Sequence, residues 1–436
     1  MSIGSSLMSS VTKLVAHVRE PLYRNGYALV LSSAATSAFG MVYWILAARF
    51  YSAEVVGINS AVLSMVMFLG GIAQFNLVNV LNRFLPRAGH AAKGLIVRVY
   101  FVSTIAAVVA SLIFILGVEI WSPALGFLAA SPFRIVWFTA ATVSWSIFAL
   151  QDGALTGLRQ ATWVPIEGTV FAIAKIVLLV ILAKSMPQYG LLASWVISIG
   201  FVLLPINVLI FQCLIPQHVR VAEDQTVPIV TMQIVKYVSG DYVGYLLWMA
   251  MTTILPVIVV QRVGAEATAY YFLCQTIAYA LYLVSRNMGM SLITEAALDQ
   301  GKLNDYSYQV LVGTTRMLLP VVFVMVLGAS YILRLFGDAY VTEGTTLLRL
   351  LCISAIPNIV TSLYTSVSRV KRRMRAIVVM VVSLCALILG LTYLLIAAYG
   401  IAGIGIAWLV GQTVVAVYLL LTEFRPLLFP PPTYRH

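Results

Sequence analysis

A few charged side chains interrupt segments that are otherwise apolar enough to span a membrane. Lys175 lies in VFAIAKIVLLVILAK, Arg286 in ALYLVSRNMGMSL, Arg316 in VGTTRMLLP and Asp241 in KYVSGDYVGY. A charge at bilayer depth costs about 2.5–3.5 kcal/mol on insertion scales, so it usually faces a cavity or a partner. Basic side chains in a cavity would bind an anionic group, a lysine as a point charge and an arginine as a bidentate fork.

The sequence leaves several roles open for these charges. Lys175 lies about 16 Å into its helix at 1.5 Å per residue, which is near the midplane. It either lines a cavity, pairs with a carboxylate such as Asp241, or extends toward the membrane surface. Asp241 is a candidate coupling site for a proton or sodium ion, an ion-pair partner, or a helix-turn feature beside Gly240. Arg316 is close enough to the cytoplasmic surface to reach it.

The composition identifies the class of protein. Hydrophobic residues make up 61% of the 436 residues and charged residues 10%, whereas soluble domains have about 45–50% and 25%. The chain is therefore an integral membrane protein. Its net charge of +12 comes from basic residues in short loops, which indicates topology rather than nucleic-acid binding.

Twelve segments are long and apolar enough to cross a bilayer as helices, each needing roughly 20 residues. Most Lys and Arg residues fall in the N-terminus, the even-numbered loops and the C-terminus, so both termini are expected in the cytoplasm. The run from Arg369 to Arg375 is the strongest such topology signal. The predicted spans are 26–49, 54–82, 95–119, 133–157, 164–183, 189–215, 232–260, 266–296, 306–332, 344–367, 375–397 and 400–422.

These spans predict two six-helix lobes joined by a polar linker. The expected organisation is a cytoplasmic leader 1–25, an N-lobe 26–215, a linker 216–231, a C-lobe 232–424 and a cytoplasmic tail 425–436. The predicted fold is all-α and polytopic, with the two bundles arranged around a central cavity.

Sequence landmarks recur between the two halves and indicate an internal repeat. Arg159 pairs with Arg369, and Tyr189-Gly190 with Tyr399-Gly400, both at an offset of 210. An even number of helices per repeat gives both halves the same orientation in the membrane. At this offset Lys175 corresponds to Cys385 and Arg286 to Asn76, so the scaffold does not require these charges. The candidate cavity residues are Arg286, Lys175, Arg316 and Asn76.

The sequence lacks the marks of several other functions. The four cysteines form no CxxC pair, and the four histidines show no ligand spacing, so no metal site is expected. No GxxxxGK[ST] phosphate loop and no catalytic constellation in a polar loop is found, so neither ATP hydrolysis nor another enzymatic activity is expected. No cofactor is expected either.

Three stretches resemble the Wzx-type polysaccharide flippases, which are related to MATE exporters and the lipid II flippase MurJ. They are WILAARFYSAEVVGINSAVLSMVMFLGGIAQFNLVNVLNRFLPR, LQDGALTGLRQATWVP and YGIAGIGIAWLVGQTVVAVYLL. The resemblance implies flipping of a polyprenyl-diphosphate-linked oligosaccharide to the outer leaflet of a bacterial inner membrane, by alternating access, for surface polysaccharide such as lipopolysaccharide or exopolysaccharide. It also implies a basic residue in the eighth helix, here Arg286. Expected partners are the lipid-linked glycan, membrane lipids, a polysaccharide polymerase and glycosyltransferases, and no nucleic acid.

Two features separate this chain from relatives of that superfamily. MurJ-like proteins have two further C-terminal helices, whereas the twelfth predicted helix here is followed only by PLLFPPPTYRH. MATE exporters have twelve helices and carry cations with intramembrane carboxylates, so a MATE-like cation antiporter is the alternative reading. Basic residues within helices 1 and 2, frequent in the flippases, are missing before Arg49 and Arg83.

Overall fold

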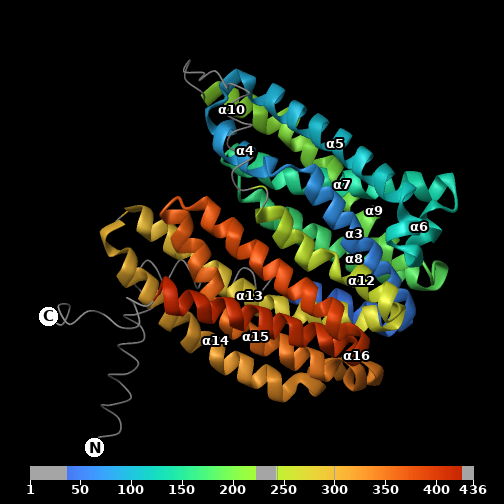
Figure 1. The fold of residues 1–436 in the computed structure, drawn as a ribbon. Helices are drawn as coiled ribbons and strands as arrows, with labels where there is room; N and C mark the ends of the chain where they lie inside the picture. The colour runs from blue at the N-terminus through green and yellow to red at the C-terminus, as the bar shows by residue number, and fades with distance from the viewer. Residues whose placement is uncertain (1–36, 222–241, 243, 299, 425–436) are drawn as a thin grey trace, which may run out of the picture. The chain divides into compact units, whose positions relative to one another are not determined.

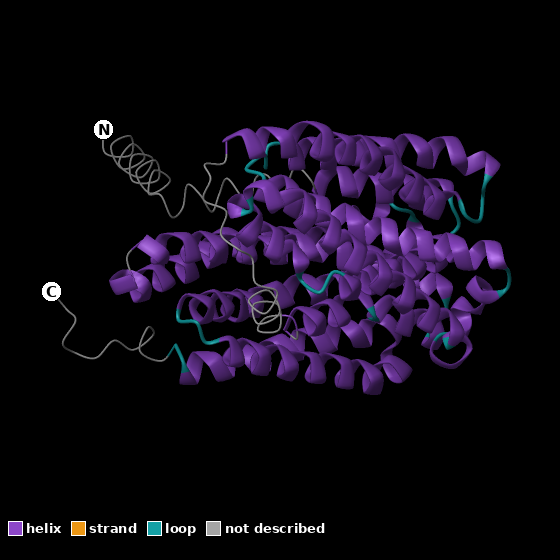
Figure 2. Ribbon diagram, turned by 90° about the horizontal axis from the view of Figure 1, so that it is seen from above, coloured by secondary structure: helices purple, strands orange, loops and turns teal. Residues whose placement is uncertain are grey.

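The computed structural model describes residues 37–221, 242, 244–298 and 300–424. Over these residues the secondary structure is helical, with short connecting loops and no strand (Figure 2). Within the described ranges, ten helices are long and apolar enough to cross a membrane. The chain is a multi-pass, all-α membrane protein, as the sequence predicts.

The helices follow the predicted spans closely (Figure 1). The described part of the first span is Ser37–Phe50, and the seventh is Gly244–Arg262, which includes α12 (Leu255–Arg262). The remaining elements are α3 (Ala53–Ala73), α4 (Leu77–Phe84), η1 (Leu85–Arg87), η2 (Gly89–Ala91), α5 (Ala92–Leu116), α6 (Val118–Trp121), η3 (Pro123–Ala129), α7 (Pro132–Gly157), α8 (Trp163–Ser185), α9 (Gly190–Val208), η4 (Leu209–Leu214), α10 (Ile215–Val221), α13 (Ala265–Leu298), η5 (Gln300–Lys302), α14 (Leu303–Arg334), α15 (Asp338–Val370) and α16 (Met374–Thr422).

One long helix contains two spans. α16 has 49 residues, and Gly400 within it has φ 54° and ψ −139°, which is not helical. Only glycine adopts such a left-handed backbone easily. The eleventh and twelfth predicted spans therefore meet at Gly400, as the sequence places them.

The second predicted span, 54–82, is broken into α3 and α4. Phe75 and Asn76 have φ values of 46° and 58°. Two successive residues therefore adopt left-handed backbone conformations, although neither is glycine. Asn79 Nδ2 donates a hydrogen bond of 2.8 Å to Asn76 Oδ1, and Tyr242 Oη donates one of 2.7 Å to the Ile72 carbonyl. These bonds satisfy polar groups around the break. Inside a bilayer no water would be available to bond those groups.

The contacts divide the chain into two compact units, one of which is Phe39–Leu273. In this unit α7 packs against α3, α4, α5 and α9, and α3 also packs against α12. Glycines allow the closest approaches: a Cβ on Gly57 would overlap the Ala265 carbonyl, and one on Gly71 would overlap the Met249 side chain. The predicted lobe boundary at 216–231 falls largely outside the described residues and stays a prediction.

The other unit contains the described chain from Cys274 onward. α15 packs along both α14 and α16. Its buried polar groups pair across helices: Thr361 Oγ1 donates to Gln412 Oε1 at 3.1 Å, and Tyr282 Oη lies 2.6 Å from Ser354 Oγ. Pairing removes the penalty of burying these groups.

The internal repeat is visible in backbone hydrogen bonds, but at an offset of 213. The turns α7–α8 and α15–α16 each have a left-handed arginine, Arg159 (φ 61°) and Arg372 (φ 56°). Their turn bonds correspond one to one. The amides of Leu158, Arg159, Gln160 and Trp163 donate to the carbonyls of Ala154, Thr156, Leu155 and Gln160, and those of Lys371, Arg372, Arg373 and Ala376 to the carbonyls of Val367, Arg369, Ser368 and Arg373.

This offset corrects the predicted pairing of Arg159 with Arg369. It continues through the next helices, because Gly190 packs against the Leu182 carbonyl as Gly403 does against that of Leu395. The buried Trp195 then corresponds to the buried Trp408. Sequence identity alone favoured an offset of 210, because it aligned the two Tyr-Gly pairs. These pairs do not occupy equivalent positions in the fold. Lys175 now corresponds to Ile388, which is fully buried and neutral.

Candidate functional site

Lys175 lies at the centre of α8 and points at two aromatic rings. Its Nζ is 4.9 Å from the ring centre of Tyr43, in the first span, and 4.9 Å from that of Phe171, one turn earlier in α8. The side chain is half-buried, and no hydrogen bond or ion pair to it is found among the described residues. Lys175 is thus held by aromatic faces within its own unit rather than by a carboxylate there.

The two rings belong to a larger aromatic group. Tyr43 is fully buried, and its Oη lies 3.1 Å from both the Leu191 carbonyl and Ser194 Oγ, which fixes the ring. Phe171 meets Trp195 edge to face at 5.6 Å. The other members in contact are Trp44 with Tyr43, Phe148 with Phe171 and Trp145, and Trp145 with Trp195.

This arrangement leaves the ammonium available to an anion. A cation over an aromatic face gains about 2 kcal/mol when desolvated, which offsets part of the cost of its depth in the membrane. The rings accept no conventional hydrogen bond, so the three N–H donors of Lys175 remain open. A phosphate or carboxylate group could receive them, and neighbouring aromatic rings offer faces for apolar or sugar groups.

The other predicted site residues lie in different settings. Arg286 in α13 and Arg316 in α14 are both exposed, and within their unit no contact joins them. Asn76 is half-buried at the break between α3 and α4, where it accepts the Asn79 hydrogen bond, and it makes no contact with Lys175. Asp241 lies outside the described residues.

Sequence reasoning missed two carboxyl groups in the unit Phe39–Leu273, one of them fully buried. Glu167 in α8 is only 1% exposed, and neither of its carboxylate oxygens has a hydrogen-bond partner. It interacts electrostatically with Asp152 of α7, and both interact with Tyr100 of α5. The signal was present in LQDGALTGLRQATWVPIEG, where two acidic residues follow one another at the ends of adjoining apolar segments.

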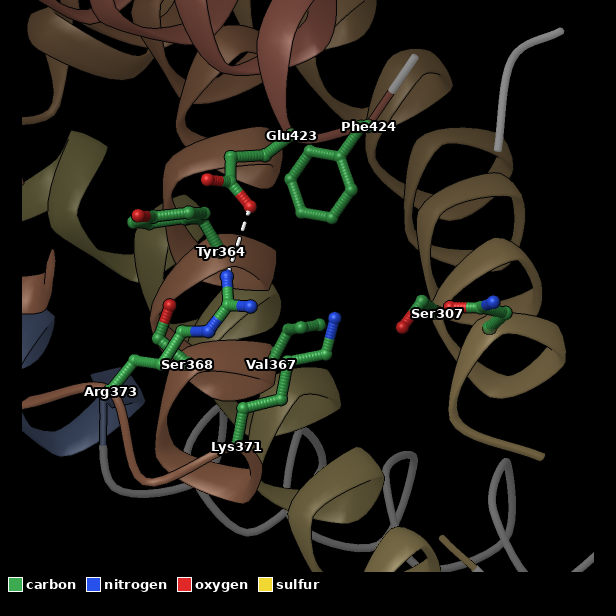
Figure 3. A pocket seen from close by; sticks show the side chains of 9 residues that line it. Ser307, Tyr364, Val367, Ser368, Lys371, Arg373, Glu423 and Phe424 are labelled. Carbon is green, nitrogen blue, oxygen red and sulfur yellow. Dashed lines mark hydrogen bonds and ion pairs between the residues drawn. The ribbon is translucent and has the colours of Figure 1, made fainter. Parts of the chain in front are cut away.

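A small pocket lies at one end of the unit that contains the described chain from Cys274 onward (Figure 3). It has a volume of about 190 Å³, and its wall includes the ion pair between Arg373 Nη1 and Glu423 Oε2 at 3.5 Å. Both side chains are about half exposed, so this pair adds little to stability. The pocket is smaller than the roughly 300–1,000 Å³ typical of ligand sites, too small for a lipid-linked oligosaccharide.

Metal ligation finds no support in the described part of the chain. No group of three or more His, Cys, Asp or Glu side chains there could hold a metal ion. The free cysteines Cys274, Cys352 and Cys385 are buried, and Cys213 is exposed.

Comparison by sequence finds no relative: no family model matches, and no curated protein matches. Comparison by structure finds several similar proteins. An inward-facing multidrug resistance MATE family transporter of the MOP superfamily matches with TM-score 0.67 and 13% identity, over 91% of this chain and 98% of that one. An outward-facing MATE family transporter of the MOP superfamily matches with TM-score 0.60 and 15% identity, over 95% and 97%.

A third similar structure is a MOP superfamily transporter from Pyrococcus furiosus, described as having a binding pocket of reverse polarity that suggests a different function. It matches with TM-score 0.62 and 14% identity, over 93% of this chain and 95% of that one. These identities are too low to carry function across, but the coverage is nearly complete on both sides. The chain therefore has the fold of the twelve-helix MATE transporters of the MOP superfamily.

Proposed function

We propose that this protein is a secondary transporter that flips a polyprenyl-diphosphate-linked oligosaccharide from the inner to the outer leaflet of a bacterial inner membrane. The observation that carries the proposal is Lys175, an ammonium at membrane depth with two aromatic faces beneath it and no carboxylate partner among the described residues. A diphosphate brings negative charge into the bilayer, and an unpaired ammonium replaces part of its lost hydration.

The fold and the polarity support the proposal in different ways. The full-length likeness to MATE transporters supports a transporter, with substrate bound near the middle of the bilayer. The transporter from Pyrococcus furiosus, whose pocket of reverse polarity suggests a different function, supports the idea that this fold serves more than one function. The aromatic group around Tyr43 and Phe171 suits a substrate that contains sugar rings.

The alternative is a MATE-like cation antiporter, which the same fold favours. Such an exporter needs carboxyl groups within the membrane, and the buried Glu167 and the half-buried Asp152 provide them. The alternative predicts that cationic compounds bind near these carboxylates. The flippase predicts that an anionic lipid diphosphate binds near Lys175.

Deleting the gene separates the two functions. The flippase predicts that polyprenyl-linked oligosaccharide accumulates on the cytoplasmic side and that surface glycan falls, with recovery on complementation. If glycan output is unchanged and resistance to cationic drugs drops, the antiporter is the better account. Surface polysaccharide, the inner-membrane location, and a polymerase and glycosyltransferases as partners all belong to the flippase proposal.

Arg286 provides a second test of substrate chemistry. As an exposed arginine in α13, it would bind a diphosphate through two parallel hydrogen bonds, which a lysine cannot reproduce. We expect Arg286→Ala to lower glycan output about tenfold or more, the scale of one lost charged hydrogen bond, and Arg286→Lys to restore part of it. Full output from both variants would remove Arg286 from the mechanism.

A further inference from the structure

The pocket in Figure 3 carries an inference that does not depend on the transported substrate. It has a volume of about 190 Å³ and lies where three helices end or begin. α14 contributes Asn304 and Ser307 from its first turns, α15 ends at Val370, and α16 begins at Met374 and ends at Thr422. These helix ends belong to one unit, in which α15 packs along both α14 and α16.

The wall of the pocket carries more positive than negative charge. Lys371 and Arg373 are its basic residues, and Glu423 is the one acid among the nine described residues that line it. Arg373 Nη1 lies 3.5 Å from Glu423 Oε2, so these two charges offset each other. That leaves Lys371 without an acidic partner in the wall, and Figure 3 shows its ammonium directed into the pocket.

Buried hydroxyl groups line the pocket beside these charges. Ser307, Ser368 and Tyr364 are all buried. The Tyr364 side chain is hydrogen-bonded to that of Ser368 and interacts electrostatically with Arg373. Its ring meets that of Phe424 edge to face, with the ring centres 6.3 Å apart. Hydroxyl donors beside a lysine and an arginine can bind the oxygens of a phosphate group.

The turn that carries the basic residues has a defined backbone. The amides of Lys371 and Arg373 donate hydrogen bonds of 2.9 and 2.8 Å that close the turn between α15 and α16. The equivalent turn between α7 and α8 closes with the same bonds, but it has Leu158 and Gln160 in these places. The geometry of the turn therefore does not require the two cations.

The role of basic residues as a topology signal does not account for the pocket either. Such a signal needs basic residues somewhere in a short loop. The α7–α8 turn has a single one, Arg159, within 156–162, whereas the equivalent stretch from Arg369 to Arg375 has five. A topology signal also needs no cavity and no buried hydroxyl groups beside the charges.

The neighbours of the lining residues are suited to contact with lipid. Tyr308, next to Ser307 on α14, and Leu421, two residues before Glu423, are large apolar side chains that are exposed. Exposed apolar residues on a membrane span face lipid, and tyrosine is frequent at the level of the headgroups. The distribution of basic residues predicts that this end faces the cytoplasm, where anionic lipids attract basic clusters.

We propose that this pocket binds the phosphate group of an anionic lipid of the cytoplasmic leaflet, with Lys371 as its principal cation. The hydroxyl groups of the wall donate to the remaining phosphate oxygens, and Arg373 is close enough to exchange its exposed ion pair for the ligand. The volume of about 190 Å³ suits a headgroup, and the acyl chains would lie along apolar surface such as that of Leu421. The site uses none of the residues of the proposed transport site.

The test uses the purified full-length protein without any glycan. Native mass spectrometry follows the binding of phosphatidylglycerol, and thermal unfolding midpoints are compared in nanodiscs of phosphatidylcholine with and without phosphatidylglycerol. We expect a tightly bound phosphatidylglycerol in a one-to-one ratio and a midpoint that rises with it. Inorganic phosphate and glycerol 3-phosphate form a second arm. If they stabilise the protein as strongly as phosphatidylglycerol does, the ligand is a soluble phosphate compound and the lipid assignment is wrong.

Variants with equal changes in charge separate a built site from general attraction. Lys371→Gln should lower the affinity for phosphatidylglycerol about tenfold or more, the scale of one lost charged hydrogen bond. Arg375→Gln removes the same charge from the same turn, at an exposed position outside the pocket wall, and should bind as the wild type does. Glu423→Gln releases Arg373 for the phosphate and should raise the affinity.

All three substitutions are at exposed positions, and unfolding midpoints in phosphatidylcholine alone check that each variant is folded. Equal losses of affinity in Lys371→Gln and Arg375→Gln would mean diffuse attraction to a basic loop and would overturn the site. Wild-type affinity in Lys371→Gln would overturn it as well. Neither result bears on the glycan assays, because the lipid site and the transported substrate are tested separately.

Discussion

At the scale of the residue, Lys175 carries a charge that opposes stability and that we propose serves transport. Its charge costs about 2.5–3.5 kcal/mol at the centre of a membrane helix, and the Tyr43 and Phe171 rings return only part of it. The equivalent position in the second half is the buried Ile388. An apolar residue therefore satisfies the packing of the fold at this position. Residues that oppose stability in this way are typical of functional sites.

Replacing Lys175 with methionine should therefore separate stability from transport. Lys175→Met keeps the length of the side chain and removes the charge, so the unfolding temperature should stay equal or rise, while surface-glycan output falls. The matched control is Lys184→Met, at the exposed last turn of the same helix. It should leave output intact and lower stability by about 0.3–1 kcal/mol, because a cation there favours the helix dipole.

The sequence identified the unusual charges but not their surroundings. Lys175 stood out because it interrupts an apolar run. Its contact with Tyr43, more than a hundred positions earlier, depends on packing that no local pattern reveals. Glu167 and Asp152 were overlooked because they flank the polar turn between two apolar segments, where charged residues are common. Only the burial of Glu167 without a hydrogen-bond partner distinguishes the pair.

At the scale of the element, α3 depends on three glycines, Gly57, Gly70 and Gly71, to approach its neighbours. Gly57 lies against the Ala265 backbone at the start of α13, where an added methyl group would overlap the carbonyl oxygen. Because backbone atoms cannot move aside as a flexible side chain can, an added methyl group there should destabilise the fold by the full cost of overpacking.

Gly57→Ala should accordingly lower the free energy of unfolding by about 1–3 kcal/mol. The same substitution at Gly200, in the middle of α9 with open space around it, should raise helix stability by up to about 1 kcal/mol. Thermal unfolding in detergent measures both. Equal effects at the two positions would mean that the contact between Gly57 and Ala265 is not present in the folded protein.

The break between α3 and α4 makes a second prediction about an element. Asn76 is left-handed, a conformation that glycine adopts freely and alanine resists. Asn76→Gly should therefore be tolerated better than Asn76→Ala, by about 1 kcal/mol. Asn79→Ala removes the same side-chain hydrogen bond but leaves Asn76 unchanged. The difference in unfolding free energy between Asn76→Ala and Asn79→Ala therefore measures the cost of placing alanine in the left-handed conformation.

The helices themselves were largely predictable, and their irregularities were not. Continuous apolar runs of about 20 residues fix where a chain crosses the membrane, so the described spans agree with the predicted ones, and Gly400 lies at the predicted junction. The break at Phe75 and Asn76 gave no such signal, because neither residue is glycine or proline. Tertiary hydrogen bonds such as that from Tyr242 hold the chain there.

For the whole molecule, the distribution of basic residues predicts which ends of the helices face the cytoplasm. The test is labelling of single cysteines, in a variant without the four native ones, by a maleimide that cannot cross membranes. Glu119→Cys, at the predicted outer end of the third span, should be labelled in intact spheroplasts. Lys371→Cys, in a predicted cytoplasmic turn, should react only after permeabilisation. Both positions are exposed, and the reverse pattern would invert the predicted topology.

The matching turns at Arg159 and Arg372 have a consequence for the history of the chain. Two halves that keep the same backbone bonds at a constant spacing, while sharing few side chains, are copies that diverged after duplication. One copy carries Lys175, Glu167 and Asp152, and the other carries Ile388, Met380 and Thr365 in their places. The neutral residues of the second half therefore show what the shared architecture accepts at these three positions, without the charges that the first half carries there.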